Sequence, residues 1–378
     1  MLPRYGCVEY NDCGVHVDKS ELTDDGNSKP QRRRVRYSGT HPKEFSQKYK
    51  EHAIDAHPEL LEHLRAKGKT PAGTHIPILT GPIMAALSPR AGEVVADCTL
   101  GYGGHATAFL ERIGPTGKLV GLDVDGPHLE RTRQRLSNID VPMYFYRSNF
   151  AGLGGVMQKE GLAGFDIIFA DLGVSSMQID DPSRGMSYKH DGPLDMRMDD
   201  RHKQTAADLL ATLGQKELAE ALWELADEPD HKAIAQQIII QRAAQPLTII
   251  SQLVELVLEV KGLTLKEWKR QVRSAPGLLH PAARTFQALR ILVNDELGAL
   301  KALLRAAPYC LRAGGRIGII SFHSGEDRLV KKAFAQGLEE ELYVAIAEEV
   351  IVPDKDEIAA NPRSRSAKFR WAMRNLTI

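Results

Sequence analysis

A glycine-rich turn after a short apolar run is the first part of the sequence suited to chemistry. Residues 93–97 (Glu-Val-Val-Ala-Asp) lead into residues 101–105 (Gly-Tyr-Gly-Gly-His), and a helix is predicted over 106–113. Glycines let the backbone turn sharply and approach a ligand closely, and the first N–H groups of a helix are free to bind it. A second apolar run ends at Asp123, about 20 residues further on, where a carboxylate binds ribose hydroxyls in nucleotide-binding folds. The pattern predicts a nucleoside-binding site.

Two kinds of cofactor fit such a turn. Gly101, Gly103 and Ala106 satisfy the dinucleotide fingerprint with alanine in third place, which indicates a nicotinamide-dependent oxidoreductase. That fold needs a second βαβ unit, whereas here Asp171 is followed by Leu-Gly-Val-Ser-Ser and then by a long stretch with helical periodicity. S-adenosylmethionine has no pyrophosphate and no second nucleotide. One nucleoside-binding half of the sheet and a lid that faces the substrate are therefore enough to bind it. We therefore expect S-adenosylmethionine, with a nicotinamide cofactor as the alternative.

Asp171 ends another apolar run, residues 165–171, at the sheet edge where open α/β sheets bind their ligands. Its carboxylate is suited to hold the cofactor or to orient a substrate amine, and a simple capping role fits this residue alone equally well. The segments 180–185 and 191–199 that follow are dense in turn formers and paired charges. Long ordered loops of this kind usually carry function, which favours a role for Asp171 in the site.

Apolar runs separated by helical stretches predict a parallel sheet that is covered on both faces. Its strands are expected at residues 93–97, 118–123, 143–146, 165–171 and 316–322, and inserted helices at 217–226, 231–244 and 251–260. One further helix is expected from Pro281 past Leu304, ending before a turn at Gly314-Gly315. Residues 343–352 and 367–373 are expected to close one sheet edge as an antiparallel hairpin.

The predicted fold class is therefore α/β, a Rossmann-like sheet of the S-adenosylmethionine-dependent methyltransferase kind with an inserted all-helical subdomain. We expect a polar N-terminal extension over residues 1–74. The core is expected over 75–180 and 285–378, and the helical insertion, which would recognise the substrate, over 181–284.

Composition narrows the classes of partner. With 49 basic and 49 acidic residues the formal net charge is zero, so contacts with nucleic acid must come from local basic clusters. No run approaches the ~18 apolar residues of a membrane span, and the N-terminus has no apolar signal core, so we expect no membrane partner and a cytoplasmic protein. Cys7, Cys13 and His16 are wrongly spaced for zinc, and we expect no metal.

Five motifs follow one another in an order typical of one family. Together they closely resemble the bacterial ribosomal RNA small subunit methyltransferase H (MraW) family, over about His75 to Arg374. The motifs lie at residues 171–185, 191–198, 280–290, 321–328 and 361–370. The resemblance implies transfer of a methyl group from S-adenosylmethionine to the exocyclic N4 of a cytidine in the decoding region of 16S ribosomal RNA. Gly325, Ala283 and the segment 226–228 depart from the family pattern, and none of them falls on the implied cofactor contacts.

The resemblance also implies a set of site residues. Its cofactor contacts fall on Gly103, Gly104, His105, Asp123, Phe150, Asp171 and Gln178. Phe150 would lie against the adenine, whereas its sequence context alone indicates a core residue. The candidate catalytic groups are Asp171, Ser175 and Ser176, one of which would accept a hydrogen bond from the cytosine amine.

Two absences bear on the chemistry. Methylation of a ring carbon would need a cysteine near the loop after Asp171, and neither Cys98 nor Cys310 is there, which favours nitrogen. The Asp-Pro-Pro-aromatic motif of many amino-methyltransferases is also missing. The aromatic residue that stacks on the base is therefore not identified, and Tyr188 is a candidate for which surface packing is an equal alternative.

Basic residues in the later motifs are candidates for phosphate contacts with the small-subunit RNA. They are Arg284, His323, Arg328, Arg363, Arg365 and Lys368. Structural salt bridges are the alternative for Arg284 and Arg328, and the basic run 32–36 is expected to be simply solvated. A non-enzymatic RNA-binding protein is disfavoured because the cofactor constellation is intact. The sequence leaves the oligomeric state open, including a homodimer.

Overall fold

The computed structural model describes residues 77–275 and 278–377, all within the compact unit Lys43–Ile378. The predicted N-terminal extension, with its basic run at 32–36, lies outside the described residues.

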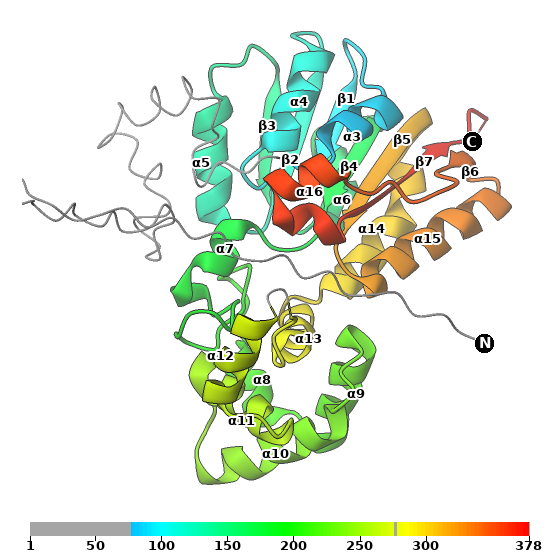
Figure 1. The fold of residues 1–378 in the computed structure, drawn as a ribbon. Coiled ribbons are helices and arrows are strands. Elements are labelled where there is room, and N and C mark those ends of the chain that lie inside the picture. Colours follow the sequence, from blue (N-terminus) through cyan, green and yellow to red (C-terminus); the bar gives the residue numbers. More distant parts are fainter. Residues whose placement is uncertain (1–76, 276–277, 378) are drawn as a thin grey trace, which may run out of the picture. The chain divides into compact units, whose positions relative to one another are not determined.

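A seven-stranded sheet forms the centre of the described chain, in the order β3-β2-β1-β4-β5-β7-β6 (Figure 1). The first five strands are parallel, β7 runs antiparallel to β5, and β6 runs antiparallel to β7. The bounds are β1 Val94–Asp97, β2 Lys118–Asp123, β3 Met143–Arg147, β4 Phe165–Asp171, β5 Leu311–Ser321, β6 Tyr343–Ile346 and β7 Lys368–Arg374. The α/β class and the antiparallel closing hairpin at one edge are thus confirmed.

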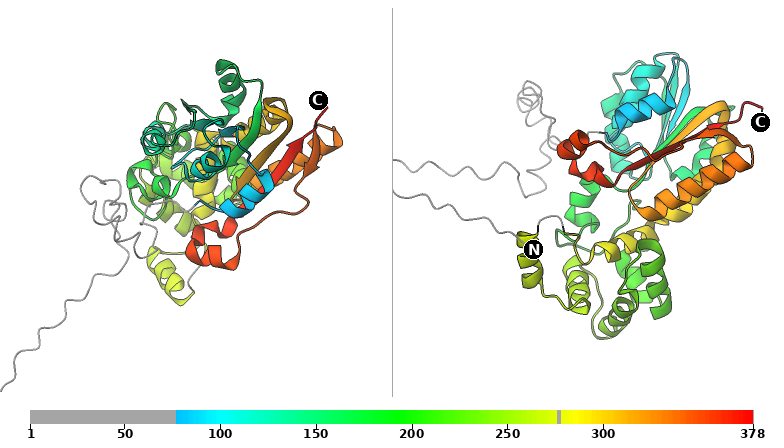
Figure 2. Two further views of the ribbon diagram at one scale, coloured as in Figure 1. Left: turned by 90° about the horizontal axis from the view of Figure 1, so that it is seen from above. Right: turned by 45° about the vertical axis from the view of Figure 1, so that its right-hand side comes forward.

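Helices cover both faces of the sheet, as the continuously apolar strands predict (Figure 2). Neighbouring residues of β1 point to opposite faces and pack in two different apolar cores, each built with its own set of helices. Val95 packs in the core with the first set of helices, and Ala96 packs in the core with the second set. The first set is α3 Thr80–Leu87, α4 Gly104–Ile113 and α5 Gly126–Leu136. The second is α6 Leu153–Lys159, α14 Glu296–Cys310 and α15 Ser324–Glu339.

Between β4 and α14 the chain builds a separate helical cluster with its own apolar core, which runs from Leu194 to Val293 (Figure 1). The expected helices at 217–226, 231–244 and 251–260 are confirmed, whereas α8 and α12 were not predicted. The cluster contains α8 Ala206–Thr212, α9 Gln215–Ala226, α10 His231–Ala244, α11 Ile250–Val260, α12 Leu265–Ser274 and α13 Ala283–Asn294. Because Phe286 and Leu289 of α13 pack in this core, we propose that the insertion ends at Asn294 rather than at residue 284.

The single helix expected from Pro281 past Leu304 is wrong, because the chain forms two helices there. Asp295, between α13 and α14, has a left-handed backbone with φ 47°. The buried amide of Asn294 fixes the break: its Oδ1 accepts the N–H of Met198 at 2.7 Å, and its Nδ2 donates to the carbonyl of Met196 at 2.8 Å. A tertiary contact therefore interrupts a run that is apolar at helical spacing throughout.

Two strand predictions near the C-terminus also need correction. Gly314-Gly315, expected as a turn, lies inside β5, where the pairing with β4 shifts register after Phe165. The expected strand 343–352 is interrupted, since β6 ends at Ile346 and Ile351 makes only an isolated bridge to Phe369. The following α16 Lys355–Ala360 and 3₁₀ turn η4 Pro362–Ser366 were not predicted.

Replacing Asn294 tests the junction between the helical cluster and the sheet. Asn294→Ala leaves the partly buried N–H of Met198 and the buried carbonyl of Met196 without this partner, so we expect a loss of about 2–3 kcal/mol in the free energy of unfolding. Denaturant titration measures this, with Gln336→Ala, an exposed amide on α15, as the control. An unchanged unfolding midpoint for Asn294→Ala would contradict this account of the break.

Candidate active site

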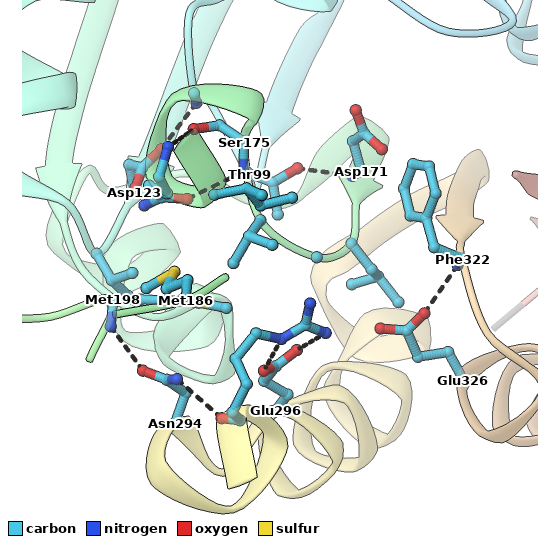
Figure 3. A pocket seen from close by; sticks show the side chains of 18 of the residues that line it. Thr99, Asp123, Asp171, Ser175, Met186, Met198, Asn294, Glu296, Phe322 and Glu326 are labelled. Atoms are coloured by element: carbon cyan, nitrogen blue, oxygen red, sulfur yellow. Dashed lines mark hydrogen bonds and ion pairs between the residues drawn. The ribbon is translucent and has the colours of Figure 1, made fainter. Parts of the chain in front are cut away.

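A cavity of about 740 Å³ opens at the carboxyl ends of β1, β2, β4 and β5, where residues of α13 and α14 also line it (Figure 3). Open α/β sheets bind ligands at this edge, where the strand order reverses beside the first strand. The volume lies within the range of small-molecule and cofactor sites.

Most of the expected cofactor contacts lie together in this cavity. Its lining includes Gly104, His105, Asp123, Phe150, Asp171 and Gln178. Gly103 is not in the lining, but it is the residue before α4 and has φ 67°. A Cβ there would come within 2.8 Å of Thr132 Cγ2, so a glycine is needed for the turn to form against α5.

The carboxylate of Asp123 shapes the glycine turn as well as facing the cavity. Its Oδ2 accepts the N–H of Gly101 at 2.8 Å, and its Oδ1 accepts the N–H of Asp125 at 2.9 Å. The hydroxyl of Thr132 donates to the carbonyl of Gly101 at 2.5 Å and secures the same turn from α5. Burial raises the pKa of Asp123 to about 6. The hydrogen bonds of Asp123 and Thr132 thus define the shape of the turn with protein groups alone.

Asp171, at the end of β4, carries an unsatisfied polar atom. Its Oδ1 is buried and has no hydrogen-bond partner among the described residues, while its Oδ2 lies 3.7 Å from Nδ1 of His105. Its backbone N–H donates to Oγ1 of Thr99 at 2.6 Å, which fixes the end of β4 against the residues after β1. Burial, with the charges of Asp97 and Glu326, raises the pKa of Asp171 to about 8. Such an oxygen suits a donor group on a ligand.

The loop after β4 uses one of the two expected serines as a helix cap. Oγ of Ser175 accepts the N–H of Gln178 at 3.2 Å, and Oε1 of Gln178 accepts the N–H of Ser175 at 3.0 Å, a capping box for α7 Ser176–Asp180. Ser175 lines the cavity, whereas the side chain of Ser176 lies outside the described residues.

Asp125 is a connecting residue that the sequence reasoning missed. Its side chain is fully buried, and Oδ2 accepts hydrogen bonds from Nε2 of Gln178 at 3.0 Å and Nη2 of Arg184 at 2.7 Å. It also caps α5 through the N–H of His128. An aspartate followed by Gly-Pro at a helix start is a recognisable cap signal, but its bonds to Gln178 and Arg184 are not visible in the sequence.

The structure adds further cavity residues that the sequence did not single out. Arg290 forms a two-point ion pair with Glu296 at 2.8 and 3.0 Å across the break between α13 and α14. Phe322, which follows β5, stands beside Asp171 (Figure 3). Tyr188 also lines the cavity, but its ring is stacked on His280 with centroids 4.2 Å apart.

The expected RNA-binding residues fall into separate groups. Arg284 and Arg328 line a smaller groove of about 160 Å³, Arg363 and Arg365 line the main cavity, and His323 lines both. Lys368 lines neither and pairs with Asp327 at 3.3 Å.

An ion pair or hydrogen bond within the protein makes a basic side chain less available to an RNA phosphate. Arg363 pairs with Asp180 at 3.0 Å, and Arg284 donates to the carbonyl of Asp227 at 2.5 Å. Arg328 and Arg365 are exposed and have no ion pair within the described part of the chain.

Neither a membrane span nor a metal cluster is found among residues 77–275 and 278–377. No helix there is long and apolar enough to cross a bilayer. No three His, Cys, Asp or Glu side chains of that part gather as a metal site requires.

Comparisons with known proteins match this chain along most of its length. The model of the MraW methylase family matches residues 72–375. Ribosomal RNA small subunit methyltransferase H 1 of Lachnoclostridium phytofermentans is 41% identical over 347 residues, which cover 91% of this chain and 93% of that protein. Ribosomal RNA small subunit methyltransferase H 2 of Alkaliphilus metalliredigens is 40% identical over 355 residues, covering 93% and 99%.

Asp97 makes the stability of the fold depend on pH. It is 1% exposed, and burial raises its pKa from 3.8 to about 7. Between these values the folded state holds a proton that the unfolded state has lost, so rising pH favours unfolding, by at most about 1.4 kcal/mol per pH unit. Above about pH 7 this contribution stops changing.

We expect Asp97→Asn to flatten the fall in unfolding free energy between pH 4 and 7, because the amide keeps an acceptor for the N–H of Thr99 but does not titrate. Denaturation midpoints measured across this range test the prediction, with Asp140→Asn, an exposed carboxylate, as the control. Parallel pH profiles for Asp97→Asn and the wild type would show that Asp97 does not contribute to the fall in stability.

Proposed function

This chain belongs to the MraW methylase family, and we propose that it methylates the exocyclic N4 of a cytidine in the decoding region of 16S ribosomal RNA. S-adenosylmethionine is the methyl donor of this enzyme. The observation that carries the proposal is Asp171, which lines a cavity of about 740 Å³ and whose Oδ1 has no hydrogen-bond partner among the described residues. A flat, amine-bearing base can offer this atom an N–H donor. We propose the cytoplasm, where ribosomal RNA is available, as its place of action.

The residues on the nucleotide side of the cavity fit the cofactor. The start of α4 at Gly104 lies at the cavity, and the first turn of a helix with its positive dipole end suits the cofactor's carboxylate. Asp123 is proposed to bind the ribose hydroxyls, Phe150 to lie against the adenine, and Gln178 to close the same end. The antiparallel β7 stands where a dinucleotide fold would continue with a parallel strand, which counts against the nicotinamide alternative. When bound, S-adenosylmethionine supplies an electrophilic methyl group.

Transfer to an amine is an in-line displacement, which depends chiefly on positioning. The lone pair of cytosine N4 is delocalised into the ring, so the amine must be held in a reactive orientation. We assign this task to Asp171, whose Oδ1 would accept one N4–H. Ser175 is less suited, because its oxygen already accepts a backbone N–H as the cap of α7.

The same carboxylate is placed to take up a proton. As the bond from N4 to the methyl carbon forms and the bond from sulfur to that carbon breaks, N4 must lose a proton. A pKa of about 8 makes ionised Asp171 a stronger base than an ordinary aspartate. We therefore propose that Asp171 first orients the amine and then accepts its proton.

Methyl transfer itself tests the proposed function. Incubation with labelled S-adenosylmethionine and small subunits that lack the modification should label one cytidine, at N4, located by nuclease mapping and mass spectrometry. RNA binding without labelling would favour the non-enzymatic alternative, and labelling at another atom would overturn the assignment of N4.

Replacement of Asp171 tests its role in that reaction. Asp171→Asn keeps the shape of the side chain but cannot accept the proton, so the rate of methyl transfer should fall roughly 100- to 10,000-fold. Single-turnover rates with saturating RNA measure this, with Asp140→Asn as the control. Full turnover by Asp171→Asn would remove Asp171 from both tasks.

Arg328 and Arg284 are proposed to guide the RNA backbone toward the cavity. They line the small groove, and Gln287 and His323 line both this groove and the main cavity. Arg328 is exposed and carries no ion pair within the described chain, so its charge is available to a phosphate.

We expect Arg328→Ala to reduce the slope of log affinity against log salt concentration by about 1, as the loss of one phosphate contact does. Filter binding or fluorescence anisotropy over a series of salt concentrations measures the slope. Arg133→Ala, an exposed arginine on α5, is the control and should leave it unchanged. An unaltered slope for Arg328→Ala would mean that this residue does not contact RNA.

A further inference from the structure

Residues 171–176, which end β4 and begin the connection that follows, contain no aromatic residue on which a target base could stack. Residues 171–176 read Asp-Leu-Gly-Val-Ser-Ser, and the position two residues after Asp171 is Gly173, with φ 98°. A base that enters a protein pocket gives up stacking on its neighbours, and an aromatic ring in the pocket restores it. An aromatic platform for the base would therefore come from another element.

Phe322 is an aromatic residue that the pairing of β5 with β4 places at the cavity, close to the end of β4. It directly follows β5, which pairs with β4 in parallel, with Asp171 opposite Ile320. The carboxyl ends of both strands therefore meet at the cavity, where the ring of Phe322 stands beside Asp171 (Figure 3). A Cβ at Gly173 would lie 3.6 Å from Cδ2 of Phe322, so a larger side chain at that position would rest on the ring that the glycine leaves uncovered.

The backbone of Phe322 is held firmly. Its N–H donates to Oε2 of Glu326 at 2.8 Å, and the N–H of His323 donates to the same oxygen at 3.3 Å. Glu326 is 2% exposed, and its Oε1 lies 3.2 Å from Nε2 of His323. The ring packs partly against the core that includes Ile320 and also lines the cavity. A ring so supported is an ordered platform.

The other aromatic residues of the cavity are less suited to this role. Tyr188 stacks on His280, Phe286 packs edge-on against Tyr188, and Tyr102 contacts His128 at 5.7 Å. Phe150 lies on the nucleotide side, where we place the adenine. Phe322 is the aromatic residue next to the carboxyl group that we propose to orient the amine.

We infer that Phe322 is the platform on which the target cytosine stacks, with its N4 edge turned toward Asp171. This inference rests on the proposed function and names the residue that holds its substrate. Stacking is insensitive to base identity, so Phe322 supplies affinity and orientation, while selection of an amine belongs to Asp171.

Photocrosslinking tests the contact directly. The probe is a decoding-region RNA fragment with 5-iodocytidine at the methylated position, irradiated in the near ultraviolet on the full-length enzyme with S-adenosylhomocysteine. A stacked aromatic ring crosslinks to the halogenated base, and peptide mapping should locate the bond on Phe322. A crosslink on Tyr188 or Phe286 instead would overturn the inference.

Kinetics of matched variants provide a second readout. With unmodified RNA, Phe322→Leu should lower kcat/KM by about 5- to 150-fold, the range for loss of one stacked base. Phe322→Trp should restore most of it, because the indole keeps an aromatic face. Titration calorimetry should find the same affinity for S-adenosylhomocysteine in all variants, and Tyr144→Leu, a partly exposed residue of β3, is the control for loss of an aromatic ring elsewhere.

The outcomes separate the two proposals. If the wild type methylates a cytidine and Phe322→Leu matches it, the platform is wrong and the proposed function stands. If the wild type transfers no methyl group to cytidine, the proposed function fails, and the platform with it. If Phe322→Trp is as slow as Phe322→Leu while both keep the wild-type melting temperature, an aromatic face is not what this position supplies.

Discussion

A fully buried carboxylate cannot be left without partners, and the construction of this site depends on that constraint. Asp125 meets it by accepting bonds from the start of α5, from Gln178 and from Arg184. The start of α5 belongs to the nucleotide side of the sheet, whereas Gln178 and Arg184 belong to the segment that follows β4. One unpaired charge would be so costly that both sides must stay together, which keeps one wall of the cavity in place before a ligand binds.

The same sheet edge gathers three further carboxyl groups, Asp97, Asp123 and Asp171, and burial raises the pKa of each. Such clusters reduce stability and are typical of functional sites. A ligand that carries a positive sulfonium and an ammonium group is favoured by negative potential of this kind. The cost in stability and the suitability for the methyl donor therefore have one physical origin.

Two apolar cores meet at the cavity, and their junction is polar. Asn294 ties the loop at Met196 and Met198 to the end of α13, and the pair Arg290–Glu296 spans the break that follows. Directional bonds at this junction define where the helical cluster ends and α14 begins, which apolar packing alone would not do. The wall of the cavity opposite the sheet is thereby held in position.

Local patterns were sufficient to predict the parallel strands, the glycine turn and the positions of Asp123 and Asp171 at the ends of strands. The reason is that apolar periodicity and turn chemistry depend on neighbours along the chain. The five ordered motifs were sufficient for the family. What only the tertiary structure decided are contacts between distant segments: Arg184 on Asp125, Asn294 at the helix break, and Phe322 beside Asp171. Phe322 reaches Asp171 only through the register of β5 on β4, and the long helical insertion between those strands hides that pairing from any local pattern.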